Sequence, residues 1–191
     1  MVSTRNSRAD VVAAAGRLFA EKGYHGTSMR DLGRELGLLG SSLYAHVDSK
    51  QDLLVGVVEE GARLFQDSAE RALAVEGSGS DRLRTLISGH VDVVLANLEV
   101  VRTFLNEAGM LDADHRSRVI AARDRYEQAF REAIALGAGD GSLRTDVDPK
   151  MASIFVLSIL NALERWYHPG GELGRDQLVE AVVSFVTTGI R

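Results

Sequence analysis

Cysteine is absent from this chain of 191 residues, and proline occurs only twice, at positions 149 and 169. The absence of cysteine excludes disulfides and thiolate metal ligands, so a reducing compartment such as the cytoplasm is the simplest location. The apolar residues recur three and four positions apart rather than alternating as in strands. We therefore expect an all-α protein of about nine helices.

Long hydrophobic runs are also lacking. The longest nearly continuous one extends from Met151 to Leu163, which is shorter than the roughly 20 residues that a membrane-spanning helix needs. The polar N-terminus has no signal-peptide core. We predict a cytoplasmic protein with no membrane partner. Because residues 151–163 are apolar on nearly every face, they must be covered on more than one side, and a partner subunit is the economical cover.

Positively charged residues are outnumbered by negatively charged ones, 22 Lys and Arg against 27 Asp and Glu, which gives a net charge of −5. This balance argues against nonspecific attraction to nucleic acid. Residues 1–50, however, carry seven Lys and Arg against five Asp and Glu, whereas residues 51–191 carry fifteen against twenty-two. We expect any contact with DNA to lie in the first fifty residues.

The motifs of enzymes are missing as well. The stretch "GAGDGS" at 137–142 follows a helix rather than a strand and lacks phosphate-loop spacing. There is no G-x-S-x-G nucleophile motif, no H-x-x-x-H pair, and no ligand set around Asp146 and Asp148. We predict no catalytic residue, no metal site and no cofactor.

The N-terminal quarter has the pattern of a helix-turn-helix. A first amphipathic helix ends at Gly23, and a second starts with Thr27 or Ser28 as its N-cap and stops at Gly37. After the turn "GLLG", a third short helix carries Leu43 and Val47. In such a motif the helix after the turn enters the major groove of DNA.

The remaining boundaries follow from caps and breakers. Ser49 and Asp52 form a capping box that starts a fourth helix, which runs toward Ala74. Asp148 and Pro149 are a second strong start signal. We expect one helix to begin at Asp81, and three more to run from Val100 to Gly109, from Asp112 to Gly137 and from Pro149 to about Tyr167. A last helix is expected around Leu178–Val186.

Two stretches carry a family resemblance: "AAGRLFAEKGYHGTSMRDLGRELG" and, a few residues later, "SSLYAHVDSKQDLL". Together they resemble the N-terminal domain of TetR-family transcriptional repressors over roughly residues 9–58. The resemblance implies a three-helix DNA-binding domain over 1–50 and a helical ligand-binding and dimerisation domain over 51–191. It also implies a repressor that a small hydrophobic effector releases from a palindromic operator.

The resemblance also implies which residues contact the operator. Thr27, Ser28, Tyr44, His46 and Lys50 would hold phosphates, and Ser41, Ser42 and Tyr44 would lie near base edges. Arg30 is a further candidate, and Arg5 belongs to a basic arm that can reach adjacent phosphates or the minor groove; solvated tail charges are the alternative for this arm. Leu39 and Gly40 stand where many members have Ser-Lys or Ser-Arg, so base preference cannot be carried over. The candidate DNA-binding set is Arg5, Thr27, Ser28, Arg30, Gly40, Ser41, Ser42, Tyr44, His46 and Lys50.

A single DNA-binding domain of this size contacts too few base pairs to define a unique site in a genome. Such proteins therefore usually form dimers that bind two half-sites. The two most apolar helices of the C-terminal part provide the surface for this. We expect a homodimer joined by a four-helix bundle whose interface includes Met151, Phe155, Leu157, Val182, Val183 and Val186.

The segments "DGSLRTDVDP" and "RWYHPGGELG" resemble the subgroup that regulates fatty-acid or sterol breakdown and senses acyl-CoA esters. Such an effector would suit a long apolar cavity with cationic groups at its mouth. The candidate lining is Phe65, His90, Arg102, Phe104, Arg123, Tyr126, Phe155 and Trp166. The alternative for these residues is an ordinary core, with His90 hydrogen-bonded inside it. The alternative for the whole chain is a helical interaction or small-molecule-binding protein without specific DNA binding, which would show no salt-sensitive duplex binding.

Overall fold

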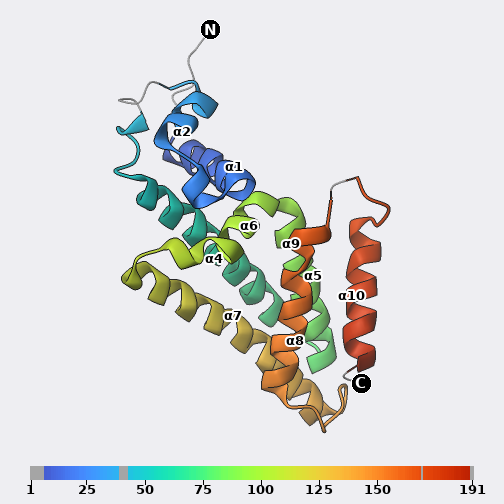
Figure 1. The fold of residues 1–191 in the computed structure, drawn as a ribbon. Helices are drawn as coiled ribbons and strands as arrows, with labels where there is room; N and C mark the ends of the chain where they lie inside the picture. The colour runs from blue at the N-terminus through green and yellow to red at the C-terminus, as the bar shows by residue number, and fades with distance from the viewer. Residues whose placement is uncertain (1–6, 39–42, 169, 190–191) are drawn as a thin grey trace. The chain divides into compact units, whose positions relative to one another are not determined.

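The computed structural model describes residues 7–38, 43–168 and 170–189. These ranges contain helices and no strand, which confirms the all-α prediction (Figure 1). Within them, no helix is both long and apolar enough to cross a membrane. The elements are α1 (Arg8–Gly26), α2 (Met29–Leu36), α4 (Lys50–Leu73), α5 (Gly79–Ala96), α6 (Leu98–Asn106), the 3₁₀ turn η1 (Ala108–Met110), α7 (Ala113–Asp140), α8 (Pro149–Asn161), α9 (Leu163–Trp166) and α10 (Arg175–Gly189).

Several helices begin with the same local device, a Ser-x-x-Asp capping box. At α2 the Ser28 hydroxyl accepts from the backbone N–H of Asp31, and the Asp31 carboxylate accepts from the backbone N–H of Ser28. The same reciprocal pair starts α1 at Ser7 and α5 at Ser78. These side chains satisfy backbone donors that lack a partner within the helix. At α4, Ser49 Oγ accepts from the Asp52 N–H as the sequence predicted, whereas the Asp52 carboxylate accepts from the backbone N–H of Asp48 and from Arg8.

Two predicted boundaries around glycines were wrong. Helix α5 begins at Gly79 rather than Asp81, because Asp81 is the third residue of the box that Ser78 opens. Helix α7 continues past Gly137 to Asp140. A Cβ at Gly137 would lie 2.6 Å from the Leu143 side chain, so this glycine permits close packing instead of ending the helix.

Two further boundaries also differ from the prediction. Helix α8 ends at Asn161 instead of continuing to Tyr167, and Ala162, with φ −66° and ψ −17°, makes a tighter turn before the short α9. Ala is a strong helix former, so the sequence gives no signal for this break. Helix α6 begins at Leu98, two residues before Val100, and η1 follows it near the predicted end at Gly109.

The chain divides into two compact units. The first unit comprises Met1–Ala62 and Glu99–Ile120, and the second comprises Arg63–Leu98 and Ala121–Arg191. Helices α4 and α7 therefore contribute to both units.

In the first unit, α1 packs tightly against α4 and α6. The buried Thr103 hydroxyl on α6 donates to the backbone carbonyl of Gly16 on α1 at 3.2 Å. A Cβ on Gly61 of α4 would lie 2.7 Å from the Cβ of Phe104. Because only glycine fits that approach, α6 lies directly against α4.

In the second unit, α10 packs along α5. Exposed ion pairs join the two helices: Arg175 forms a two-point contact with Asp92 at 2.5 and 2.7 Å, and Arg84 contacts Glu180 at 2.9 Å. The start of α5 also approaches α7 closely, since a Cβ on Gly79 would lie 2.0 Å from the backbone nitrogen of Gly137.

Candidate DNA-binding and effector sites

The helix-turn-helix lies in the first unit. Helix α2 is followed by the C-cap residue Gly37, whose φ of +64° is the left-handed conformation that glycine adopts without strain. The Leu38 N–H then donates to the Gly33 carbonyl at 2.8 Å and closes the helix end. Of the predicted DNA contacts, Arg5, Gly40, Ser41 and Ser42 lie outside the described residues.

Residues 43–47, the described part of the predicted recognition helix, have one buried face and one exposed face. Leu43 and Val47, four residues apart, are buried, whereas the Tyr44 side chain is 55% exposed and His46 is half-buried. Val47 thus packs on the apolar side of the segment. Arg30 on α2 is also exposed. Tyr44 and Arg30 are therefore accessible to an external partner, and His46 is partly accessible.

Three other predicted phosphate contacts have partners within the protein. Thr27 is buried, and its hydroxyl lies 3.0 Å from the Gly23 carbonyl and 3.2 Å from the Leu18 carbonyl, both on α1. Ser28 is the N-cap of α2. These two hydroxyls fix the junction between α1 and α2.

Lys50 is the third. Its Nζ donates to the carbonyls of Tyr24 and Thr27, each at 2.9 Å, and it lies 4.2 Å from the centre of the Tyr24 ring. A cation in this position neutralises carbonyls at the C-terminal end of α1. The lysine holds the start of α4 to the end of α1.

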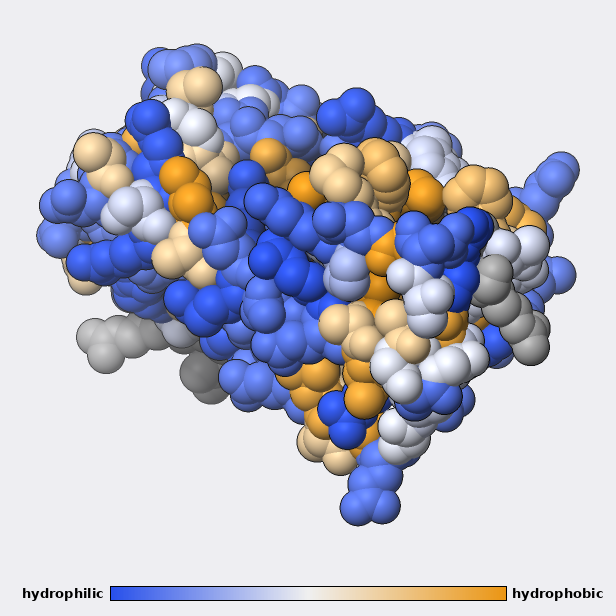
Figure 2. All heavy atoms as spheres, turned by 90° about the horizontal axis from the view of Figure 1, so that it is seen from below, coloured by the Kyte–Doolittle hydropathy of each residue, from blue (hydrophilic) through white to orange (hydrophobic). Residues whose placement is uncertain are grey.

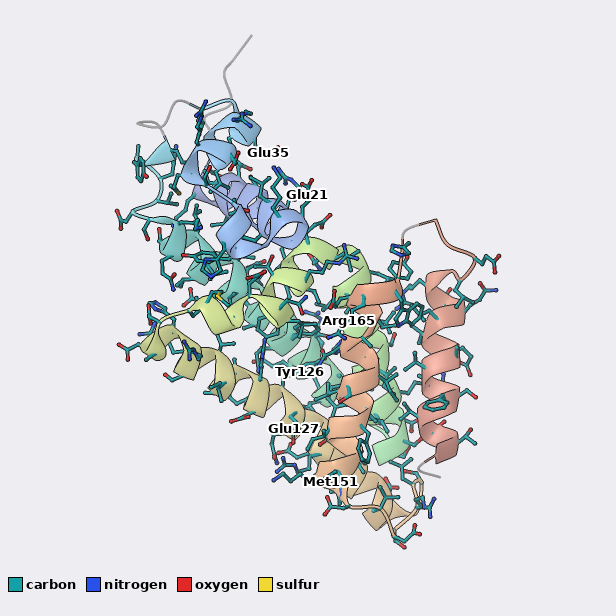
Figure 3. The ribbon with its side chains drawn as sticks, in the orientation of Figure 1. Glu21, Glu35, Tyr126, Glu127, Met151 and Arg165 are labelled. Atoms are coloured by element: carbon teal, nitrogen blue, oxygen red, sulfur yellow. The ribbon has the colours of Figure 1, made fainter. Side chains whose placement is uncertain are left out.

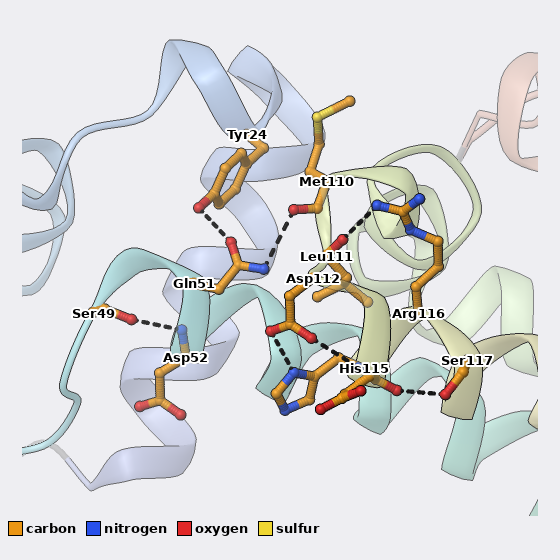
Figure 4. A network of polar contacts seen from close by, with 11 residues as sticks. Tyr24, Ser49, Gln51, Asp52, Met110, Leu111, Asp112, His115, Arg116 and Ser117 are labelled. Atoms are coloured by element: carbon orange, nitrogen blue, oxygen red, sulfur yellow. Dashed lines mark hydrogen bonds and ion pairs between the residues drawn. The ribbon is translucent and has the colours of Figure 1, made fainter.

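A polar network extends this packing to η1 (Figure 4), and its contacts through Gln51 were not predicted from the sequence, whereas the cap at Asp112 was. The Tyr24 hydroxyl donates to Gln51 Oε1 at 2.9 Å, and Gln51 Nε2 donates to the Met110 carbonyl at 3.3 Å. Asp112 then caps α7 by accepting from the backbone and ring nitrogens of His115, which lowers the pKa of its carboxyl group. The contact between Gln51 and Met110 joins residues 59 apart, so only the fold brings them together.

An aromatic cluster occupies the interior of the second unit. Phe65 on α4, His90 on α5 and Tyr126 on α7 have ring centroids 4.7 to 5.9 Å apart, and Phe130 stacks edge-on against Tyr126 at 5.4 Å. Figure 3 labels Tyr126 on its helix. Three predicted lining residues therefore meet, and Phe130, which was not among the predicted lining residues, joins them. A tyrosine and phenylalanine four residues apart on one helix were the available signal.

His90 and Tyr126 are also hydrogen-bonded to each other. His90 Nδ1 lies 3.2 Å from the Tyr126 hydroxyl oxygen, and both side chains are buried. Burial lowers the pKa of His90 to about 3, against the opposing effect of the Leu160 carbonyl, and it raises the pKa of Tyr126. Both groups are therefore neutral near pH 7. Partial burial also lowers the pKa of Arg123 on α7.

The other predicted lining residues lie elsewhere. Phe155 and Trp166 are exposed at the surface of the second unit, and Arg102 and Phe104 belong to α6 in the first unit. Among the described residues there is no group of three or more side chains suited to hold a metal ion.

The predicted dimer residues divide into two sets. Val182, Val183 and Val186 on α10 are buried within the single chain and Leu157 is half-buried, whereas Met151 and Phe155 on α8 are exposed. Phe185, which was not in the predicted set, is exposed as well. A hollow of about 800 Å³ lies between α8 and α10, with Met151, Phe155 and Phe185 among its lining residues. The face drawn in Figure 2 also shows hydrophobic patches among hydrophilic side chains.

Comparison with known families gives two separate matches. Residues 11–57 match the family described as "Bacterial regulatory proteins, tetR family", and residues 76–190 match the "Tetracyclin repressor-like, C-terminal domain". The second match alone covers more than half of the chain.

Individual relatives match over nearly their whole length. The HTH-type transcriptional repressor KstR2 of Rhodococcus jostii is 29% identical over 96% of this chain and 90% of its own. The crystal structure of PfmR, a TetR family transcriptional regulator from Thermus thermophilus, is 31% identical with a TM-score of 0.86 and covers 93% of this chain and 97% of its own. A structure of AibR in complex with isovaleryl coenzyme A and operator DNA has the same TM-score at 24% identity, covering 94% of this chain and 97% of its own. The chain therefore belongs to the TetR family of bacterial regulatory proteins and is a DNA-binding transcriptional repressor, not an enzyme.

Proposed function

We propose that this repressor is a homodimer that leaves a palindromic operator when a small hydrophobic effector binds, with acyl-CoA esters as the effector class. The effector acts only because its affinity differs between the dimer conformation that binds DNA and the conformation that does not. A regulator of this kind binds its DNA in the cytoplasm, which is where we place the protein.

The observation that carries the DNA-binding part is the division of the recognition segment into buried Leu43 and Val47 and exposed Tyr44. This arrangement holds the segment against the head while its outer face stays open to a groove. Tyr44, Arg30 and His46 would contact DNA from the described residues, together with Arg5, Gly40, Ser41 and Ser42. Thr27, Ser28 and Lys50 support the head through the contacts described above.

The exposed apolar side chains of α8 and α10 support dimerisation. Met151, Phe155 and Phe185 border one hollow, and exposed aromatic side chains that gather in this way are typical of protein interfaces. The buried Val182, Val183 and Val186 support α10 from beneath. Residues 51–191 would thus serve pairing and effector binding, and residues 1–50 would serve DNA binding, a functional division that need not coincide with the packing units.

The aromatic cluster of Phe65, His90, Tyr126 and Phe130 supports an apolar effector, with Arg123 as a cation on the same helix as Tyr126. The AibR complex holds an acyl-CoA and operator DNA in a protein of the same fold, which makes this class the first to test.

The test begins with selection of a duplex from a random pool at low ionic strength. The selected sequence should be a palindrome, and its affinity should fall steeply with salt, as phosphate neutralisation requires. Adding acyl-CoA esters of increasing chain length to the complex should release the duplex, as followed by fluorescence anisotropy. If no ester releases DNA or shifts the melting temperature, the effector class is wrong while the DNA-binding function stands.

A further inference from the structure

A hollow of about 490 Å³ lies between α4 and α5 in the second unit. Every residue that lines it belongs to 64–75 of α4 or to 85–97 of α5, and the aromatic cluster around His90 is not part of its lining. It shares no lining residue with the hollow between α8 and α10. Its size falls within the range of small-molecule pockets in proteins.

The hydroxyl group of Ser68 on α4 lines this hollow and makes no hydrogen bond to any described residue. A serine inside a helix can donate back to the carbonyl four residues earlier, as Ser158 does to Ile154. Ser68 instead points toward α5, where a Cβ on Gly89 would collide with its oxygen. The residue is only 4% exposed, yet its oxygen is not fully enclosed. Its donor is therefore available to a group that enters the hollow.

Arg71 lies one turn after Ser68 on α4 and lines the same hollow. It is exposed, and it makes no hydrogen bond or ion pair to any residue that the structure describes. Residues three apart on a helix are neighbours on its surface. The guanidinium group and the hydroxyl group are therefore two neighbouring donors, one charged and one neutral.

The two carboxylates that line the hollow are each paired with an arginine outside the lining. Asp67 contacts Arg63 at 2.6 Å. Asp92 accepts from Arg175 of α10 at 2.5 and 2.7 Å. Together with Arg71, these arginines outnumber the two carboxylates, so the hollow favours a negatively charged group.

Much of the remaining lining is apolar. It includes a side chain that is 42% exposed, that of Val75, and three more from the two helices: Leu64, Ala72 and Val93. Covering such surface with an apolar chain is favourable. The hollow thus combines an anion-binding end with surface for a hydrocarbon tail.

The charges around the hollow narrow the class of ligand further. A cation would meet the guanidinium group of Arg71. A dianion such as a phosphate monoester would be repelled by the carboxylates of Asp67 and Asp92. A plain hydrocarbon would leave the Ser68 hydroxyl without an acceptor.

We propose that the hollow between α4 and α5 binds a small organic monocarboxylate with an apolar tail. One carboxylate oxygen accepts from the Arg71 guanidinium group and the other from the Ser68 hydroxyl group, while the tail packs on the apolar lining. This site is additional to the proposed acyl-CoA effector site, and it does not depend on that proposal.

Three ligands with hydrocarbon chains of equal length test the charge preference: octanoate, octan-1-ol and octylammonium. Each is titrated into the isotope-labelled full-length protein, and the assigned backbone amide signals are followed by NMR. Octanoate should shift the signals of Ala72, Val75 and Val93 in a saturable way and leave those of Tyr126 and Phe130 in place. It should bind about three- to tenfold more tightly than octan-1-ol, as a partly exposed charge-assisted hydrogen bond allows, and octylammonium should bind most weakly.

Two variants test the donors. Arg71→Met keeps an apolar stem, so octanoate should bind it only about as tightly as octan-1-ol does. Ser68→Ala should weaken octanoate binding about two- to tenfold, the range for one hydrogen bond. Arg125→Met is the matched control, because this exposed arginine of the same unit makes no ion pair to a described residue and does not line the hollow. It should bind octanoate as the wild type does, and a melting curve checks that each variant is folded.

Octanoate that binds no more tightly than octan-1-ol, or equally well to the wild type and to Arg71→Met, would overturn the proposal. Shifts centred on Tyr126 and Phe130 would also overturn it, because they would place the acid in the aromatic cluster. A lack of saturable binding at millimolar concentration would exclude the site. None of these measurements uses DNA or an acyl-CoA, so this proposal and the proposed function can fail separately.

Discussion

The ammonium group of Lys50 lies 2.9 Å from the backbone carbonyl of Tyr24 and 4.2 Å from the centre of its ring. A second carbonyl, that of Thr27, accepts from the same nitrogen. One side chain at the start of α4 thus binds the end of α1. The TetR resemblance predicts that this lysine binds a DNA phosphate, whereas in the structure it donates hydrogen bonds within the DNA-binding domain.

Replacing Lys50 with Met keeps the stem and removes the charge, which separates these roles. Because hydrogen bonds from a charged donor contribute about 1.5–3 kcal/mol, we expect a loss of that size in the free energy of unfolding, measured in urea. Arg30→Met, at an exposed position, should leave stability unchanged and lower the salt dependence of DNA binding by about one phosphate contact. A Lys50→Met protein of full stability and reduced salt dependence would assign the lysine to DNA instead.

Tyr44→Ala tests the outer face of the recognition segment. The side chain is more than half exposed, so its removal should change the melting temperature little. Its loss should weaken binding to the selected operator by about 1–3 kcal/mol, the range for a base-contacting residue. Replacement of Tyr24 by Phe is the matched control, since it removes a tyrosine hydroxyl that donates to Gln51 within the head. Undiminished operator affinity in Tyr44→Ala would remove this tyrosine from the interface.

The burial of His90 makes stability depend on pH. Its pKa is about 3 in the folded protein against an ordinary value of 6.5. Between these values the unfolded chain takes up a proton that the folded protein does not, so stability falls as the pH is lowered through this range. The slope is at most about 1.4 kcal/mol per pH unit. Urea unfolding at pH values from about 7 to about 5 should show this slope in the wild type and a shallower one in His90→Leu. Parallel slopes in the two proteins would mean that His90 is protonated in the fold.

The contrast between these sites shows what sequence could predict. Ser49 was recognisable as the cap of α4 because helix capping is local, and the pairing of buried Leu43 with Val47 follows from their spacing. The bond between His90 and Tyr126 joins residues 36 apart, so no pattern reports it. In α8 and α10 nearly every face is apolar, and periodicity cannot tell which side the chain itself covers. Val183 was therefore grouped with Phe155, although the structure buries the first and exposes the second.

Gly79→Ala should be among the most damaging single-methyl additions. The new Cβ would lie 2.0 Å from the backbone nitrogen of Gly137 and 2.6 Å from the carbonyl oxygen of Ala133. Backbone atoms cannot rotate away as a side chain can, so α5 and α7 must separate, at a cost of about 1–3 kcal/mol or more. Gly139→Ala is the control, since nothing lies within 4 Å of its Cβ and alanine should stabilise α7 by about 0.5–1 kcal/mol. Thermal melts that move in opposite directions would confirm both packing environments, and equal shifts would contradict them.

Phe155→Glu tests the proposed dimer without disturbing the protomer. The Phe155 side chain is 60% exposed in the single chain, so the free protomer should fold as before. In a dimer the new carboxylate would be buried in an apolar interface without a counter-charge, which is strongly unfavourable. We expect the dimer dissociation constant, measured by analytical ultracentrifugation, to rise at least about tenfold.

Ile120→Glu is the matched control, because this exposed residue lies on α7 and does not line the hollow between α8 and α10. It should leave the dissociation constant unchanged. Because two heads must bind together to reach full affinity, the Phe155→Glu protein should also bind the palindrome much more weakly at concentrations where it is monomeric. Operator affinity should recover as protein concentration is raised toward the new dissociation constant. A Phe155→Glu protein that stays dimeric at nanomolar concentration would place the dimer interface on another face of the molecule.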